Sequence, residues 1–297
     1  MEKTPHRDKL LAAISNPKCH EDVDLLNEAL VAYEKWISDT NALTSIGHER
    51  VKQMVELLNI YKDFLEVDII ARRGSLFLKR QKGQLKLDNS VIEEFLIKLI
   101  NPHILVGLPD DFNIETGPQT AFMSLSFMPS SMKSLNERPN VIVKVKDQDF
   151  TFGKSIFYKF SSDGSFNADK TTSGKFFLAV LAAEVKVNFD KTMFQECSGT
   201  ANRLKQGCPI ARYFTLVEYL DMQPEDCRLT SIDNVYLLRK AKRLPFDKRS
   251  IYEEVKRQHE NFPISADVIW NFVQEIQVFI DAVWYDPDEA LSRGSFV

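Results

Sequence analysis

The segment Phe176–Val187 constrains the fold of this chain more than any other. Its sequence, FFLAVLAAEVKV, is apolar on both of its alternating faces until Glu184. A strand with one solvated face alternates between apolar and polar residues, whereas a strand that is covered on both faces does not. The segment therefore predicts a strand in the middle of a sheet that is covered on both sides.

Four other segments are rich in β-branched and aromatic residues and predict strands, namely 141–146, 150–160, 211–220 and 234–238. Gly153 is expected to form a bend or a bulge. The polar residues 161–174 predict a long loop between the second of these strands and the central one. Residues 102–139 are rich in Pro, Ser and Gly and predict irregular structure.

Apolar residues recur at helical spacing in 25–36, 51–65, 88–101, 190–207 and 250–284. Asp88 or Asn89 is a suitable cap for the third helix, which Pro102 ends. Asp190 is a suitable cap for the fourth, and Gly207 marks its end. The chain is therefore expected to be an α/β protein in which helices flank a mixed central sheet. We expect the chain to consist of a helical N-terminal region, 1–87, and a larger part, 88–297, that ends in C-terminal helices.

The sequence argues against several classes of protein. The opening residues MEKTPHRDKL are not followed by an apolar run, and no stretch reaches the ~18–20 apolar residues that a membrane helix needs. The 4 cysteines form no CxxC pair, and the 5 histidines show no metal-ligand spacing. The sequence contains neither the phosphate-binding motif GxxxxGK[ST] nor the dinucleotide-binding motif GxGxxG. We therefore expect a cytoplasmic protein without zinc, disulfides or nucleotide chemistry.

The charge of the chain is unevenly distributed. Its formal net charge is −4, which argues weakly against a nucleic-acid partner. Residues 72–86 nevertheless contain six basic residues and no acid, and residues 239–249 contain six basic residues and one acid. Screening confines each local field to about 10 Å, so an acidic protein can still present a phosphate-binding surface. Alternatively, the two segments are simply solvated loops.

Glu184 and Lys186 are the most informative residues of the chain. Positions i and i+2 of a strand point to the same face, so both charges project together from an otherwise apolar strand. Burying either charge alone is costly, and a metal ion and a phosphate group would be suitable partners for the pair. A structural ion pair is the alternative. The same tripeptide recurs at Glu254–Lys256, where surrounding charges predict an exposed helix.

A metal site at Glu184 requires a second carboxylate close by. If the strands around the 161–174 loop form a hairpin, residue 184 faces residue 151, close to Asp149. Asp149 is therefore the favoured first acid. Asp163 and Asp169 are the alternatives, although their surroundings predict loop residues.

Two helices offer further candidates. Glu93 or Glu94 could supply a third acid from the preceding helix. Of the two, we take Glu94 as the candidate for an additional site residue. The alternative is that both are exposed helical glutamates, with Glu94 and Lys98 as an i,i+4 pair. Gln195 follows in the next helix, one to two turns from its start, and is a candidate to line the same site.

The segment 182–196, AAEVKVNFDKTMFQE, resembles the heterodimeric restriction endonucleases typified by BbvCI. The likeness continues in patches over most of residues 41–280, at 79–90, 147–150, 219–222 and 238–243. The resemblance implies a PD-(D/E)xK nuclease core in residues 88–297. It also implies Mg²⁺ dependence and cleavage of a short double-stranded site of the interrupted CCTNAGC type, with each subunit cutting one strand. Glu184 and Lys186 match the E-x-K half, but no Pro precedes Asp149.

The resemblance also implies roles for particular residues. Asp149, Glu184 and Lys186 would be catalytic, with the two acids holding the metal. Basic residues in both segments would contact DNA, namely Lys79, Arg80, Lys82, Arg239, Lys240 and Arg243. Region 1–87 is a candidate for DNA contact or dimerisation, and the partner would be a second endonuclease subunit in a heterodimer or homodimer. Two alternatives remain open: a related repair or recombination nuclease, and a non-catalytic DNA-binding protein.

Overall fold

The structure is a computed structural model that describes residues 3–108, 114–282 and 286–295. The N-terminal elements are α1 (Pro5–Ile14), η1 (Pro17–Asp22), α2 (Val23–Asn41), α3 (Gly47–Lys62), the π-helical η2 (Asp63–Arg73), α4 (Leu76–Gln81) and α5 (Asn89–Leu99). The strands and the helix between them are β1 (Glu115–Phe127), β2 (Val141–Ser161), β3 (Thr171–Phe189), α6 (Lys191–Gly207), β4 (Arg212–Leu220) and β5 (Asn234–Lys242). The C-terminal helices are α7 (Tyr252–Asn261), α8 (Ala266–Asp281) and α9 (Pro287–Arg293).

The five strands form one mixed sheet in the order β1-β2-β3-β4-β5. β1, β2 and β3 are antiparallel neighbours, and β4 and β5 run parallel to β3. The predicted central strand is therefore confirmed as the third of five. Its residues Leu181, Ala183 and Val185 belong to one buried cluster and Ala182 to another, so both faces are covered. The first cluster includes α5 and α8, and the second includes α6.

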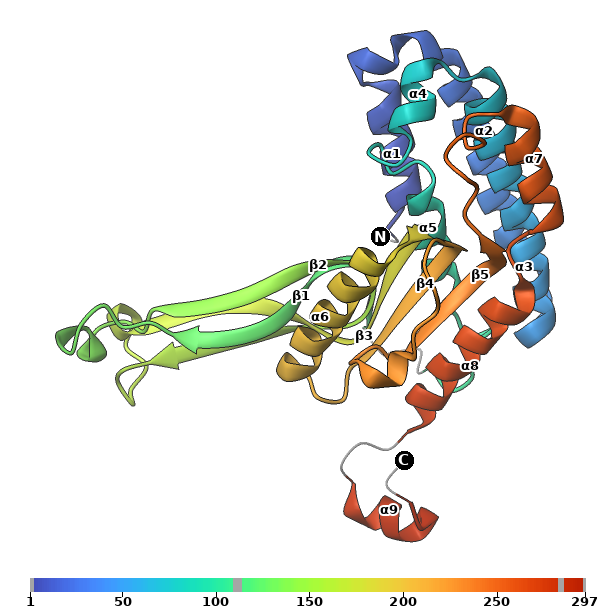
Figure 1. Cartoon of the computed structure of the whole chain (residues 1–297). Helices are drawn as coiled ribbons and strands as arrows, with labels where there is room; N and C mark the ends of the chain where they lie inside the picture. The colour runs from blue at the N-terminus through green and yellow to red at the C-terminus, as the bar shows by residue number, and fades with distance from the viewer. Residues whose placement is uncertain (1–2, 109–113, 283–285, 296–297) are drawn as a thin grey trace.

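β1, β2 and β3 extend beyond the helices as a long three-stranded arm (Figure 1). A bulge interrupts the pairing of β2 with β3 at Gly153, as expected for this glycine. A Cβ atom there would lie 2.1 Å from the carbonyl oxygen of Leu178, so the strands approach too closely for any side chain. Because the bulge changes the alternation along β3, Ala179 and Ala182 face the same cluster although they are three positions apart. Glu184 follows on the face of Ala182.

Several predicted elements need correction. Residues 102–139 are not irregular, because β1 lies within them; residues 109–113 lie outside the described part of the chain. The two strands expected at 141–146 and 150–160 are one strand, β2. The loop expected at 161–174 is shorter, since β3 begins at Thr171. The helical tail is divided into α7 and α8, and α1 was not predicted.

Other local predictions are confirmed. The side chain of Asp190 caps α6 by accepting a hydrogen bond from Met193 N at 2.9 Å. Asp88 caps α5 by accepting one from Asn89 N at 2.9 Å. Within residues 3–108, 114–282 and 286–295, no helix combines the length and hydrophobicity that crossing a membrane requires.

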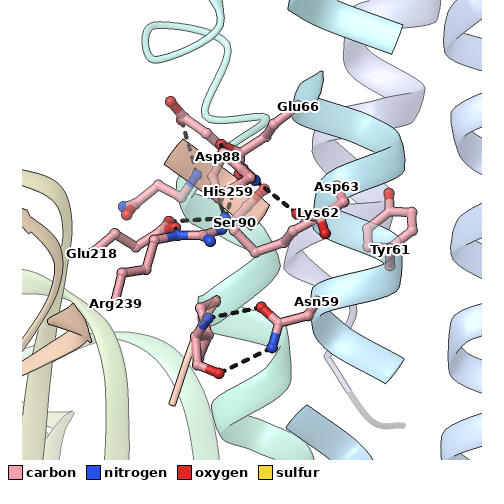
Figure 2. A network of polar contacts seen from close by, with 12 residues as sticks. Asn59, Tyr61, Lys62, Asp63, Glu66, Asp88, Ser90, Glu218, Arg239 and His259 are labelled. Carbon is pink, nitrogen blue, oxygen red and sulfur yellow. Dashed lines mark hydrogen bonds and ion pairs between the residues drawn. The ribbon is translucent and has the colours of Figure 1, made fainter. Parts of the chain in front are cut away.

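The N-terminal helices and the sheet share one hydrophobic cluster, which includes Leu58 of α3 and Phe150 of β2. A buried polar network also joins them (Figure 2). Lys62 Nζ of α3 lies 2.8 Å from Glu218 Oε1 of β4 and donates to the backbone oxygen of Asp88 at 3.0 Å. Arg239 Nε of β5 lies 2.8 Å from the other oxygen of Glu218. Removing one partner from such a network leaves an uncompensated buried charge.

Candidate active site

Glu184 and Lys186 project from the same face of β3, as predicted. Lys186 Nζ lies 2.7 Å from Glu184 Oε1. The Glu184 side chain is 17% exposed and that of Lys186 is 25% exposed, so solvent still reaches the pair. The second copy of the tripeptide, at Glu254 and Lys256, lies on α7, where Lys256 is exposed.

Asp149 lies on β2 beside these two residues. Phe150 pairs with Ala183 and Thr151 with Ala182, so the register differs by two residues from the one predicted. The bulge and the shorter turn account for that difference, and they bring Asp149 next to β3. Its Oδ2 accepts a hydrogen bond from the backbone N–H of Val185 at 3.0 Å.

The alternative first acids lie elsewhere. Asp163 is in the turn between β2 and β3 at the far end of the arm, where its carboxylate accepts hydrogen bonds from Ser165 N and from Asn167. Asp169 is exposed in the short helix η4 (Ala168–Lys170) of the same turn. Neither turn residue is placed with Glu184.

Two residues that are remote in the sequence complete the cluster. Lys86 Nζ lies 3.2 Å from Asp149 Oδ1 and 3.5 Å from Glu93 Oε1. Glu93 is buried on α5, and Lys86 lies in the turn between α4 and α5 with a left-handed φ of 55°. Lys86 was expected only as part of a basic segment. Its local sequence contains no signal for this role, because its partner Asp149 is 63 residues away.

The structure does not bring Glu94 or Gln195 into the cluster. Consecutive helical residues point about 100° apart, so Glu94 faces α1 and α2, and its carboxylate accepts hydrogen bonds from His6 N of α1 at 2.9 Å and from Tyr33 of α2. It is fully buried rather than exposed. Gln195 lies on α6 with an exposed side chain.

The cluster contains three carboxylates and two lysines, and the pKa values of four of these five groups are raised. Burial and the charge of Asp149 raise the pKa of Glu93 to about 7. Burial and Asp149 also raise the pKa of Glu184. Burial alone would lower the pKa of Lys186, but the Glu184 carboxylate outweighs it and raises that pKa. Lys86 shows the same balance, with Asp149 and Glu93 raising its pKa. The carboxylates therefore raise the pKa values of both lysines against the effect of burial, and the charge of Asp149 adds to the effect of burial on Glu93 and Glu184.

The cluster is not a complete metal site on its own. In the part of the chain that the structure describes, no three His, Cys, Asp or Glu side chains are arranged to hold a metal ion. Two neighbouring carboxylates, Asp149 and Glu184, are a partial donor set of hard oxygen ligands. Further ligands would have to be water and substrate oxygens.

The basic residues expected to contact DNA divide into two groups. Arg80 and Lys240 are exposed, and Lys79, Lys82 and Arg243 are half-buried, with Arg243 paired to Asp221 at 2.7 Å. Arg239 is a correction, because only 1% of it is exposed and its guanidinium binds Glu218 (Figure 2). The register of β5 against β4 shifts at this point, where Lys240 has a left-handed φ of 50°, and the irregularity leaves Arg239 in the core and Lys240 exposed.

Comparison with known proteins identifies the family. The Bpu10I restriction endonuclease family model matches residues 84–296. A chain of a solved structure described as the native BbvCI A2B2 tetramer at low resolution aligns with a TM-score of 0.66 and 17% identity, covering 94% of this chain and 97% of that chain. This likeness confirms the predicted fold class, and no curated protein matches the chain. Because the family model spans well over half of its length, this chain belongs to the Bpu10I restriction endonuclease family.

Proposed function

We propose that this type II restriction endonuclease subunit hydrolyses double-stranded DNA with Mg²⁺ bound by Asp149 and Glu184. The observation that carries the proposal is that Asp149 lies beside Glu184 on the neighbouring strand. Burial, and secondly repulsion by the charge of Asp149, raise the pKa values of both Glu93 and Glu184. A divalent cation would relieve that repulsion. Mg²⁺ is commonly bound by one or two carboxylates, with water and substrate phosphates completing its octahedral shell. Asp149 and Glu184 fit that donor set.

The remaining residues of the cluster suit phosphodiester hydrolysis. When bound, Mg²⁺ would polarise the phosphate and lower the pKa of a water molecule. Lys186, with its ammonium group 2.7 Å from Glu184, is placed to stabilise negative charge on the phosphate or to orient the attacking water. Glu93 has a pKa of about 7, so it is able to exchange a proton near neutral pH.

The DNA contacts are proposed for the basic residues that solvent reaches. α4 carries Lys79 and Arg80, and the chain continues through Lys82 to Lys86 at the acids. Lys240 and Arg243 lie at and after the end of β5. These side chains would neutralise phosphates and make binding depend on salt concentration. Region 1–87 would therefore contribute DNA contacts, and it also supplies Lys86 beside the acids.

A second endonuclease subunit is proposed as the protein partner. One active site cleaves one strand, so a double-strand break requires two sites. An asymmetric recognition sequence requires two different subunits, whereas a palindromic one suits a homodimer. BbvCI, which shares the fold, is an A2B2 tetramer. We favour a non-identical partner for this chain on that likeness.

The test is Mg²⁺-dependent cleavage of supercoiled plasmid by the purified chain, alone and with extract of the host cell. The site variants are Asp149→Asn, Glu184→Gln and Lys186→Ala. The matched control changes the second copy of the tripeptide, with Glu254→Gln and Lys256→Ala together. We expect discrete nicked or linear product from the wild type and the control, and a loss of at least about 100-fold in each site variant.

Equal cleavage by the wild type and the three site variants would overturn the assignment of the site. Product without discrete bands would favour a repair or recombination nuclease. Absence of cleavage by the chain alone that is restored by host extract would support the two-subunit proposal.

A further inference from the structure

The ammonium group of Lys86 contacts Oδ1 of Asp149, the oxygen through which this acid would bind a metal ion. The two carboxylate oxygens of Asp149 are both engaged: Oδ2 accepts the N–H of Val185 at 3.0 Å, and Oδ1 lies 3.2 Å from Lys86 Nζ. The same ammonium group lies 3.5 Å from Glu93 Oε1. A cation that ligates Asp149 through Oδ1 must therefore share that oxygen with Lys86 or displace it.

We infer that Lys86 is a built-in monovalent cation that holds Asp149 and Glu93 until a divalent metal ion displaces it. The inference rests on the proposed function, because it takes Asp149 as a metal ligand. Lys86 thus adds a residue from the N-terminal region to the control of metal binding by the nuclease core.

The backbone of Lys86 is fixed by hydrogen bonds, whereas its side chain is half-exposed and is held only by its two ion pairs. Its N–H donates to Gly83 O at 3.1 Å, and its carbonyl oxygen accepts from Ser90 N at 3.1 Å and from Ser90 Oγ at 2.5 Å. The adjoining Asp88 carbonyl is held by Lys62 of the buried network. The Lys86 side chain is 45% exposed, so it has solvent to move into. A fixed anchor with a long, half-exposed side chain suits a group that must leave and return.

Electrostatics gives the direction of the effect. Glu93, Asp149 and Glu184 carry up to three negative charges, against two positive charges from Lys86 and Lys186. A divalent ion near Asp149 would be repelled by the Lys86 ammonium, because like charges a few ångströms apart repel strongly in a half-buried site. Removing the Lys86 charge should therefore tighten metal binding.

The experiment is a calorimetric titration of the full chain with Mg²⁺, without DNA, at constant ionic strength. A pH of about 8.5 lies above the pKa of about 7 of Glu93 in the wild type. We expect Lys86→Met to bind Mg²⁺ about 10-fold more tightly than the wild type. Lys86→Arg retains the charge and should bind with nearly the affinity of the wild type. Lys52→Met, at an exposed position of α3, is the matched control and should leave Mg²⁺ affinity unchanged.

Unchanged or weaker Mg²⁺ binding by Lys86→Met, in a variant whose circular dichroism matches the wild type, would overturn the inference. If the wild type binds too weakly to measure, measurable binding by Lys86→Met supports it and none overturns it. Asp149→Asn in the Lys86→Met background separates the two claims. Lost binding there supports Asp149 as a ligand, whereas retained binding contradicts the proposed metal site whatever Lys86 does.

Discussion

The backbone N–H of Val185 donates a hydrogen bond to Oδ2 of Asp149, so the first acid is attached to the strand that carries the second. This contact sets the position of Asp149 relative to Glu184 through the backbone of β3 rather than through a flexible side chain. Val185 is itself fully buried.

Substitution of Asp149 should separate its structural role from the catalytic role that we propose for it. Asn retains an oxygen that accepts the Val185 N–H, so Asp149→Asn should abolish cleavage with little change in the free energy of unfolding. Asp149→Ala leaves that buried N–H without a partner and should cost about 1–3 kcal/mol. Urea denaturation of the two variants checks this. Equal destabilisation by Asn and Ala would show that the hydrogen bond does not hold the strands together.

Gly153 should not tolerate a side chain. In Gly153→Ala the new Cβ would lie 2.1 Å from Leu178 O, so the bulge must open and Asp149 must shift relative to Glu184. We expect a loss of about 2 kcal/mol or more in stability, together with most of the cleavage activity. Gly164→Ala is the control, because a Cβ there meets open space in the arm turn. The prediction fails if the two variants melt at the same temperature.

His6 should make the protein less stable in mild acid. Burial, and secondly the charge of Lys62, lower its pKa from 6.5 to about 3. Its ring nitrogens contact Ser90 Oγ at 2.8 Å and Tyr61 OH at 2.6 Å. The folded protein therefore resists a proton that the unfolded chain accepts below pH 6.5. Stability is present above that pH and should fall by about 1.4 kcal/mol per unit as pH decreases further.

The measurement for His6 is guanidinium denaturation between about pH 5 and pH 7 for the wild type and His6→Gln. Glu93, whose pKa is raised, contributes a slope of opposite sign in this range, so the informative quantity is the difference between the two proteins. Parallel pH profiles would exclude a neutral, buried His6.

Arg239 and Lys240 are adjacent in sequence but should behave differently. Arg239→Met removes a buried partner of Glu218 and should cost about 3–5 kcal/mol of stability, with the salt dependence of DNA binding unchanged. Lys240→Ala should change stability little and lower the slope of log K against log salt by about 1. Thermal melting and binding to duplex DNA without Mg²⁺ distinguish them. A reduced salt slope for Arg239→Met would mean that its side chain reaches DNA.

The central strand and its charged pair could be predicted because both are local properties of the sequence. Twelve residues without an exposed face define β3, and the spacing of Glu184 and Lys186 places them together. Asp149 could be predicted from the expected hairpin of β2 and β3, although the shorter turn and the bulge at Gly153 together place its register two residues from the predicted one.

The features that the sequence did not predict correctly depend on contacts between residues far apart in the chain. β1 contains Gly117 and Pro118, which normally end a strand, and only an edge position next to β2 makes this sequence acceptable. Glu93 and Glu94 are neighbours, and the packing of α5 alone decides which one faces Asp149. Arg239 lies in a basic segment typical of a DNA contact, but the register shift of β5 against β4 and the pairing with Glu218 place its side chain in the core.

The buried network of Lys62, Glu218 and Arg239 has a consequence for how this enzyme can change its specificity. A chimaera that takes residues 1–87 from a relative without a cation at position 62 would leave Glu218 and the carbonyl of Asp88 without this partner. The graft would misfold unless it restored a cation at that point. If α4 contacts DNA as proposed, new recognition sequences are therefore expected to arise by substitutions on the surface of α4 and its turn, rather than by exchange of the helical region as a module.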